Sequence, residues 1–144
     1  MQTRTKTYQY LDGSKKKVCI VVARWNKETT DGLLESALAA LEKCKMPKKN
    51  IKVVSVAGAV EIPFALHKLA QSGRYNFLVA LACVIRGETP HFDYVSRMVQ
   101  EGVLEVMLED EIPVGFGVLT VNNKKQAKAR IHVGGEAALA ALEL

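Results

Sequence analysis

Apolar and polar positions alternate along this chain in blocks, and the period of the pattern changes repeatedly between that of a strand and that of a helix. Residues 18–23 form a short, continuous apolar run of the kind that suits a strand buried on both faces. Between about Thr29 and Lys45, apolar residues recur at helical spacing, which predicts a helix. The alternation continues with predicted strands at 51–57, 77–85 and 114–120 and predicted helices at 62–71, 92–109, 124–130 and 136–144.

Polar residues, proline and glycine mark the ends of these blocks. Thr29, Thr30 and Asp31 are N-cap candidates for the first helix, and Pro47 follows its end. The pair Gly134-Gly135 is predicted to separate the last two helices.

The repeated strand-helix alternation predicts an α/β fold with a parallel sheet covered by helices on both faces. We expect a three-layer α/β/α sandwich around a four-stranded parallel sheet, built by residues 18–144 as one domain. Residues 1–17 are predicted to be a tail or an extra N-terminal edge strand. Because ligands bind beyond the carboxyl ends of parallel strands, function should be sought in the four loops at residues 24–27, 58–61, 86–91 and 121–123.

Charge and composition narrow the class of protein. The net charge is +5, but the basic clusters at 15–17, 48–49 and 124–125 are scattered and no aromatic residues interleave with them. A nucleic-acid partner is therefore not expected. No apolar run reaches the roughly 20 residues that cross a bilayer, and the basic N-terminus lacks the apolar core of a signal peptide. We expect a cytoplasmic protein without a membrane partner.

The three cysteines are expected to be reduced core residues. Cys19 and Cys83 lie inside apolar runs, and neither they nor Cys44 form a CxxC pair or a metal-ligand spacing with histidine. The sequence therefore predicts no disulfide and no metal site.

The third loop carries the richest chemistry. The strand at 77–85 leads through Arg86 and Gly87 to Thr89 and His91, where a long helix begins. Backbone N–H groups at a helix N-terminus bind anions, and the Thr89 hydroxyl can add a donor. An imidazole at the same point can transfer protons near neutral pH. This loop predicts the active site of an enzyme that handles a phosphorylated metabolite.

Four residues outside the third loop each have two possible roles. Trp25 is either a core residue or an aromatic platform for a flat heterocycle. Glu61 either favours a helix N-terminus or accepts hydrogen bonds from the hydroxyls of a polyol. Phe116 faces either the core or a ligand in a neighbouring site, and Arg130 is either a surface residue or a phosphate clamp.

Four motifs in order along the chain carry a family resemblance. The third, residues 84–95, holds the glycine, threonine and histidine of the loop together with the start of its helix. The full set resembles the lumazine synthase (6,7-dimethyl-8-ribityllumazine synthase) family: Ala23-Arg24-Trp25-Asn26, residues 58–63 (GAVEIP), residues 84–95 (VIRGETPHFDYV) and residues 113–120 (PVGFGVLT), followed by Gln126-Ala127 and Arg130.

The resemblance implies the penultimate step of riboflavin biosynthesis. In that reaction 5-amino-6-(D-ribitylamino)uracil condenses with 3,4-dihydroxy-2-butanone 4-phosphate, and phosphate and water leave without any metal or redox cofactor. The family builds homopentamers, which in some members assemble further into an icosahedral shell. A heterologous interface with cyclic symmetry permits such ring closure.

The resemblance also implies a role for each matching residue. His91 is similar to the general acid/base, and Trp25 to the aromatic that stacks on the pyrimidine. Phe116 and Arg130 resemble contributions from an adjacent subunit. The implied substrate-binding residues are Trp25, Asn26, Ala59, Val60, Glu61, Cys83, Val84, Ile85 and Phe116, and the implied phosphate-binding residues are Gly87, Glu88, Thr89 and Arg130.

One departure keeps a second function open. The family usually has a glycine- and lysine-rich stretch after the arginine, whereas here Arg130 to Val133 leads directly to Gly134-Gly135. The alternative is a catalytically weakened assembly or flavin-binding protein on the same fold. A flavodoxin-like electron carrier suits the same strand pattern, but the first loop has no Ser/Thr-rich phosphate cradle.

Overall fold

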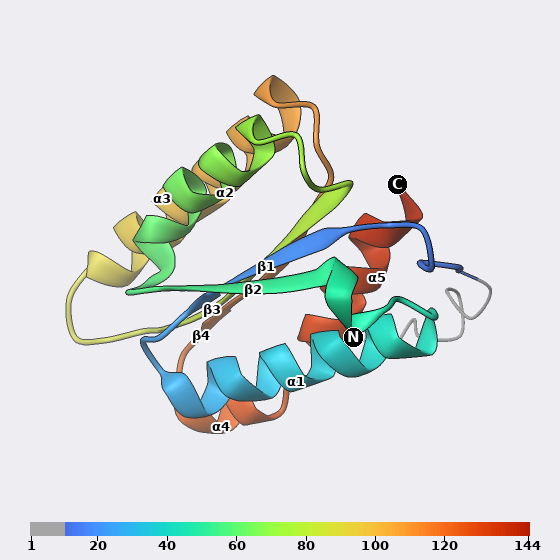
Figure 1. The fold of residues 1–144 in the computed structure, drawn as a ribbon. Coiled ribbons are helices and arrows are strands. Elements are labelled where there is room, and N and C mark those ends of the chain that lie inside the picture. The colour runs from blue at the N-terminus through green and yellow to red at the C-terminus, as the bar shows by residue number, and fades with distance from the viewer. Residues whose placement is uncertain (1–10) are drawn as a thin grey trace.

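A parallel sheet of four strands forms the centre of the molecule in the computed structural model, which describes residues 11–144 (Figure 1). The strand order is β2-β1-β3-β4. In this order β1 (Val18–Ala23) and β3 (Phe77–Ile85) are interior strands, and β2 (Ile51–Val56) and β4 (Val114–Val121) are the edges. All pairs are parallel, and the registers Ala23↔Val56 and Ile85↔Val121 bring the carboxyl ends of the four strands to the same end of the sheet, here called its carboxyl edge.

Helices cover both faces of the sheet and make the expected three-layer sandwich. Figure 1 shows α2 (Ile62–Gln71) and α3 (His91–Glu109) on one face, with α1 (Lys27–Lys43) and α5 (Val133–Glu143) on the other. The short α4 (Lys124–Lys128) lies on the α1 side. Two 3-10 turns, η2 (Lys48–Asn50) and η3 (Ala59–Glu61), lead into β2 and α2.

Alternate residues of each strand point to opposite faces, and so the core has two halves. In β1, Val18, Ile20 and Val22 pack with residues of α1 and α5. Their neighbours Cys19, Val21 and Ala23 pack against α2 and α3. Both sets are buried, which explains why β1 is an unbroken apolar run rather than an alternating one.

The prediction that Gly134-Gly135 separates two helices is wrong. Both glycines are buried inside α5, whose first turn packs on α1. A Cβ atom on Gly134 would overlap the carbonyl oxygen of Leu33, and the Gly135 amide donates to the Ser36 hydroxyl at 3.0 Å. The two glycines therefore allow close contact between helix backbones and do not break the helix.

The predicted N-cap of α1 is also wrong. The cap is Asn26, in the left-handed region at φ 60° and ψ 51°, and Thr29 and Thr30 are buried within the helix. The Thr29 and Thr30 amides both donate to the Asn26 carbonyl oxygen. The helix starts at Lys27, before the first apolar residues with helical spacing. Its first turn consists of polar residues and is held by these backbone hydrogen bonds, so the spacing of apolar residues does not reveal it.

The other sequence expectations have mixed outcomes. Cys19, Cys44 and Cys83 are buried free thiols, as predicted. The expected N-terminal edge strand concerns residues 1–17, of which 11–17 contain a turn and no strand, while 1–10 lie outside the described residues. Within residues 11–144, no helix combines the length and the apolar character needed to cross a bilayer.

Candidate active site

The loops that follow the four strands meet at the carboxyl edge of the sheet. Backbone bonds tie each loop to its neighbour. The Arg24 and Trp25 amides donate to the Val56 and Ala57 carbonyl oxygens at 2.8 and 3.1 Å, and the Arg86 amide donates to the Val121 carbonyl oxygen at 2.8 Å. Residues that are far apart in sequence thus lie along one rim.

The first loop presents an aromatic face and fixes an amide. Trp25 is 74% exposed, which excludes the core reading of this residue. The next residue, Asn26, turns the chain into α1, and its side-chain nitrogen donates to the Cys83 carbonyl oxygen at 2.7 Å. That bond leaves the Asn26 side-chain oxygen as the atom that can accept from a ligand.

The second loop places a carboxylate beside a glycine. η3 contacts both β3 and α3, with Ala59 buried and Val60 and Glu61 exposed. One Glu61 carboxylate oxygen lies 3.5 Å from the position that a Cβ atom on Gly58 would take. Glu61 stands at the N-cap of α2 but forms no capping hydrogen bond with its side chain, so its carboxylate can accept from a hydroxyl.

The third loop is open and lies at the start of the longest helix. Residues 86–90 are all exposed, and His91 is the first residue of α3. The His91 amide donates to the Thr89 hydroxyl at 3.4 Å, and a Cβ atom on Gly87 would meet nothing within 4 Å. The outward-facing amides of a helix N-terminus beside such open space suit an anion.

Arg86 holds this loop, a role that the sequence analysis missed. Its Nε donates to the Asn122 side-chain oxygen at 3.1 Å, and its guanidinium lies over the Phe92 ring, 4.4 Å from the centroid. Asp93 lies 3.7 Å away as a partly exposed ion pair. One side chain therefore connects the end of β4 to the first turn of α3. The available signal was an arginine and an asparagine at the ends of two strands predicted to lie in one sheet.

The end of β3, below this loop, carries no charged side chain. Burial raises the pKa of the Cys83 thiol, an effect that a hydrogen bond with Thr29 partly offsets. Cys83 is buried and Val84 and Ile85 are partly buried, so the strand becomes more accessible after Cys83, toward the rim. Because the thiol stays protonated at neutral pH, Cys83 can offer backbone groups and packing but no thiolate nucleophile.

Phe116 and Arg130 differ from the other predicted site residues in where the chain places them. Phe116 pairs with Ala80 and lies about 16 Å along β4 from Val121, at about 3.3 Å per residue. Arg130 follows α4 on the opposite face of the sheet from α3, and its guanidinium donates to the Gln126 carbonyl oxygen at 2.9 Å. Within one chain, Phe116 therefore lies below the rim formed by Trp25, Glu61 and His91, and Arg130 follows a helix on the α1 side of the sheet.

The parallel sheet, with its ligand-facing loops gathered at one edge, places this chain among the open-sheet α/β enzymes. The sequence model of the family described as 6,7-dimethyl-8-ribityllumazine synthase matches residues 15–144. The chain belongs to this family, whose members are transferases of riboflavin biosynthesis.

Proposed function

We propose that this chain condenses 5-amino-6-(D-ribitylamino)uracil with 3,4-dihydroxy-2-butanone 4-phosphate to give 6,7-dimethyl-8-ribityllumazine. The observation that carries the proposal is the loop 86–91, where an open glycine, a threonine hydroxyl and an exposed histidine meet at the N-terminus of α3. This arrangement can hold a phosphate and move a proton within one turn of helix.

The pyrimidine substrate fits the first two loops. The exposed Trp25 ring offers a flat apolar face to a uracil. Glu61 can accept hydrogen bonds from ribityl hydroxyls, and the backbone of Val84 and Ile85 lies at the accessible end of β3. These contacts would orient the 5-amino group toward the third loop, and such orientation contributes much of the rate of a two-substrate reaction.

The phosphorylated substrate fits the third loop. The amides of Glu88 and Thr89 would face the phosphate, with the Glu88 carboxylate turned to solvent. The 5-amino nitrogen attacks the ketone carbon and loses both of its protons, which leave with the carbonyl oxygen as water. His91 can carry these protons from the nitrogen to the oxygen. Phosphate then departs by elimination together with a proton from the adjacent carbon, and the ribitylamino nitrogen attacks the ketone that results, closing the ring with loss of a second water.

We propose further that the working site lies between two copies of the chain. Phe116 is 38% exposed on an edge strand, away from its own rim. Arg130 closely follows α4, which lies on the other face of the sheet from α3, the helix that begins at His91. A second copy placed head to tail could bring both side chains to the rim of its neighbour. A ring of such contacts is a closed cyclic oligomer, and the family resemblance favours a pentamer or multiples of it.

The test is to mix the two substrates with the purified protein and record the absorbance and fluorescence of the lumazine, while measuring the oligomer mass on the same sample. Turnover that saturates in both substrates supports the proposal. The absence of product at high enzyme concentration, with both substrates verified on another enzyme of the family, would refute it.

One observation favours a second function. Only residues 129–132 connect α4 and α5, and no lysine lies between Arg130 and Glu136. A chain with weak phosphate binding could serve as an assembly or flavin-binding protein. That alternative predicts oligomers that bind riboflavin or lumazine without turnover in the same assay.

A further inference from the structure

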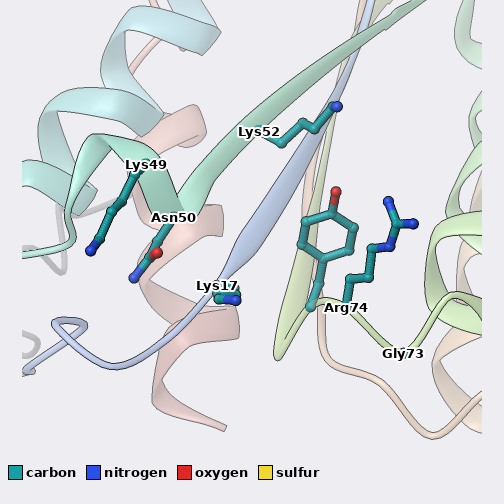
Figure 2. A pocket seen from close by; sticks show the side chains of 7 residues that line it. Lys17, Lys49, Asn50, Lys52, Gly73 and Arg74 are labelled. Atoms are coloured by element: carbon teal, nitrogen blue, oxygen red, sulfur yellow. The ribbon is translucent and has the colours of Figure 1, made fainter.

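A cavity of about 630 Å³ lies at the amino edge of the sheet, at the opposite end from the loops that form the candidate active site. Its lining includes Lys17, which precedes β1, Lys49 and Lys52 around the start of β2, and Arg74 and Tyr75 before β3 (Figure 2). Three separate segments of the chain therefore deliver four cations to one hollow.

The backbone around this cavity is fixed by reciprocal bonds. The Lys17 amide donates to the Asn76 side-chain oxygen, and the Asn76 amide donates to the Lys17 carbonyl oxygen, both at 2.8 Å. Gly73, at φ +68°, turns the chain so that Arg74 and Tyr75 follow on the cavity wall. The cations thus stand on a defined frame although their side chains are exposed.

The cationic side chains around the cavity point in different directions. Figure 2 shows the Lys52 amino group and the Arg74 guanidinium extending on the same side, while Lys49 points away from Arg74 and Lys17 lies between. The positive charge of Lys52 reaches the buried Cys19 thiol: burial raises the pKa of this thiol, and Lys52 partly lowers it again. Tyr75 is hydrogen-bonded to that thiol and is partly buried, which gives the cavity an aromatic wall.

No carboxylate balances these four charges. Every Asp and Glu of the chain lies within the described residues 11–144, and none of the ion pairs found there involves Lys17, Lys49, Lys52 or Arg74. Four like charges around one hollow repel each other, and an anion bound between them would remove that repulsion.

We propose that this cavity binds a small polyanion with two or more phosphate groups, such as an organic diphosphate or triphosphate. Arginine can hold one phosphate through two parallel hydrogen bonds, and the lysines act as mobile point charges on the others. The concave shape and the volume fit a small molecule. A nucleic acid is a poorer fit, because the cations surround a hollow and do not form a stripe with interleaved aromatics.

The experiment is calorimetric titration of the full chain with inorganic tripolyphosphate at about 0.15 M salt, where distant surface charges are screened. We expect one binding event per chain at this cavity, separate from any binding at the loop 86–91. The variant K52Q/R74Q should weaken binding about 100-fold, since each charge-assisted contact accounts for roughly a factor of ten. The charge-matched control K43Q/R97Q removes two exposed cations elsewhere and should bind within about twofold of the wild type.

Two further measurements distinguish this cavity from the candidate active site and from a nucleic-acid site. The variant T89A/R130Q, altered in the candidate active site, should keep its affinity for tripolyphosphate; loss of binding there would place the anion at the active site and overturn the proposal. A single-stranded oligonucleotide that binds more tightly than tripolyphosphate, and is weakened by K52Q/R74Q, would also overturn it. Equal weakening by K52Q/R74Q and K43Q/R97Q would mean that only net charge matters, and it would overturn the proposal too.

Discussion

The side-chain amide of Asn26 donates to the backbone carbonyl oxygen of Cys83 across 2.7 Å and so ties the end of β1 to the end of β3. Asn26 also caps α1 in a left-handed conformation, which asparagine tolerates better than most residues. Trp25 and His91 belong to the loops that leave these two strands, and the bond holds the ends of the strands together.

Replacing Asn26 separates the two roles of this residue. Asn26→Ala loses the hydrogen bond and strains the backbone, so we expect the free energy of unfolding to fall by about 2–3 kcal/mol. Asn26→Gly loses only the bond and should cost about 1 kcal/mol. Urea denaturation at fixed protein concentration measures both. Equal losses in the two variants would show that the left-handed conformation adds no strain.

Gly134 is required by the contact between α1 and α5. Gly134→Ala places a methyl group against the Leu33 carbonyl oxygen and should lower the free energy of unfolding by at least about 2 kcal/mol. Gly87→Ala is the matched control, because a Cβ atom there meets nothing within 4 Å. Its stability should stay within about 0.5 kcal/mol of the wild type. A stable Gly134→Ala variant would contradict the close packing of the two helices.

The buried Cys19 thiol should make stability depend on alkaline pH. Burial raises the pKa of Cys19 from 9.0 to about 11, so between these values the thiol ionises in the unfolded chain but not in the folded one. The folded state then binds more protons, and the free energy of unfolding falls as pH rises from 9 to 11, by about 2 kcal/mol from this group. Cys19→Ala should show a shallower decline in denaturation series over the same range. Parallel curves for the two proteins would refute this assignment.

His91 should control turnover and not folding. It is exposed at the first position of α3, so His91→Ala should leave the thermal unfolding midpoint nearly unchanged. Loss of the proton-transferring group should lower kcat about 10²–10⁴-fold. Steady-state kinetics with both substrates give kcat and KM separately. A variant that keeps wild-type kcat would exclude His91 as the acid/base.

The shared site predicts rescue between two inactive proteins. His91→Ala and Arg130→Ala should each be nearly inactive alone. When they are unfolded together and reassembled in equal amounts, about a quarter of the interfaces would combine an intact His91 loop with an intact Arg130 from the neighbour. Activity near a quarter of the wild type supports the shared site. No rescue, in oligomers shown by mass spectrometry to be mixed, would confine the site to one chain.

The sequence predicts the framework well because parallel strands buried on both faces are continuous apolar runs. The bounds of β3 and α2 agree with the predicted 77–85 and 62–71. It fails where local preference and packing disagree. Gly134 and Gly135 disfavour helix by propensity, yet here they allow α5 to touch α1. That contact joins Gly135 to Ser36, which are 99 residues apart in the sequence.

Some features of the candidate site could likewise be predicted from the sequence, and others could not. The loops containing Trp25, Glu61 and His91 were predictable, because the carboxyl ends of parallel strands must share one edge. The role of Arg86 was not, since it depends on Asn122 and Phe92 being brought to the same guanidinium. The positions of Phe116 and Arg130 relative to a bound substrate depend on a second copy, which one sequence read as one chain does not specify.

The packing of α5 on α1 also links the end of the chain to the first loop of the site. α1 begins at Lys27, directly after Trp25 and Asn26, and α5 presses on it with no side chain between Gly134 and the Leu33 backbone. α1 therefore has little freedom to slide or rotate, and the indole of Trp25 has a rigid base. Substitutions in the last helix, remote from any substrate, should consequently be felt as poorer recognition of the flat ring.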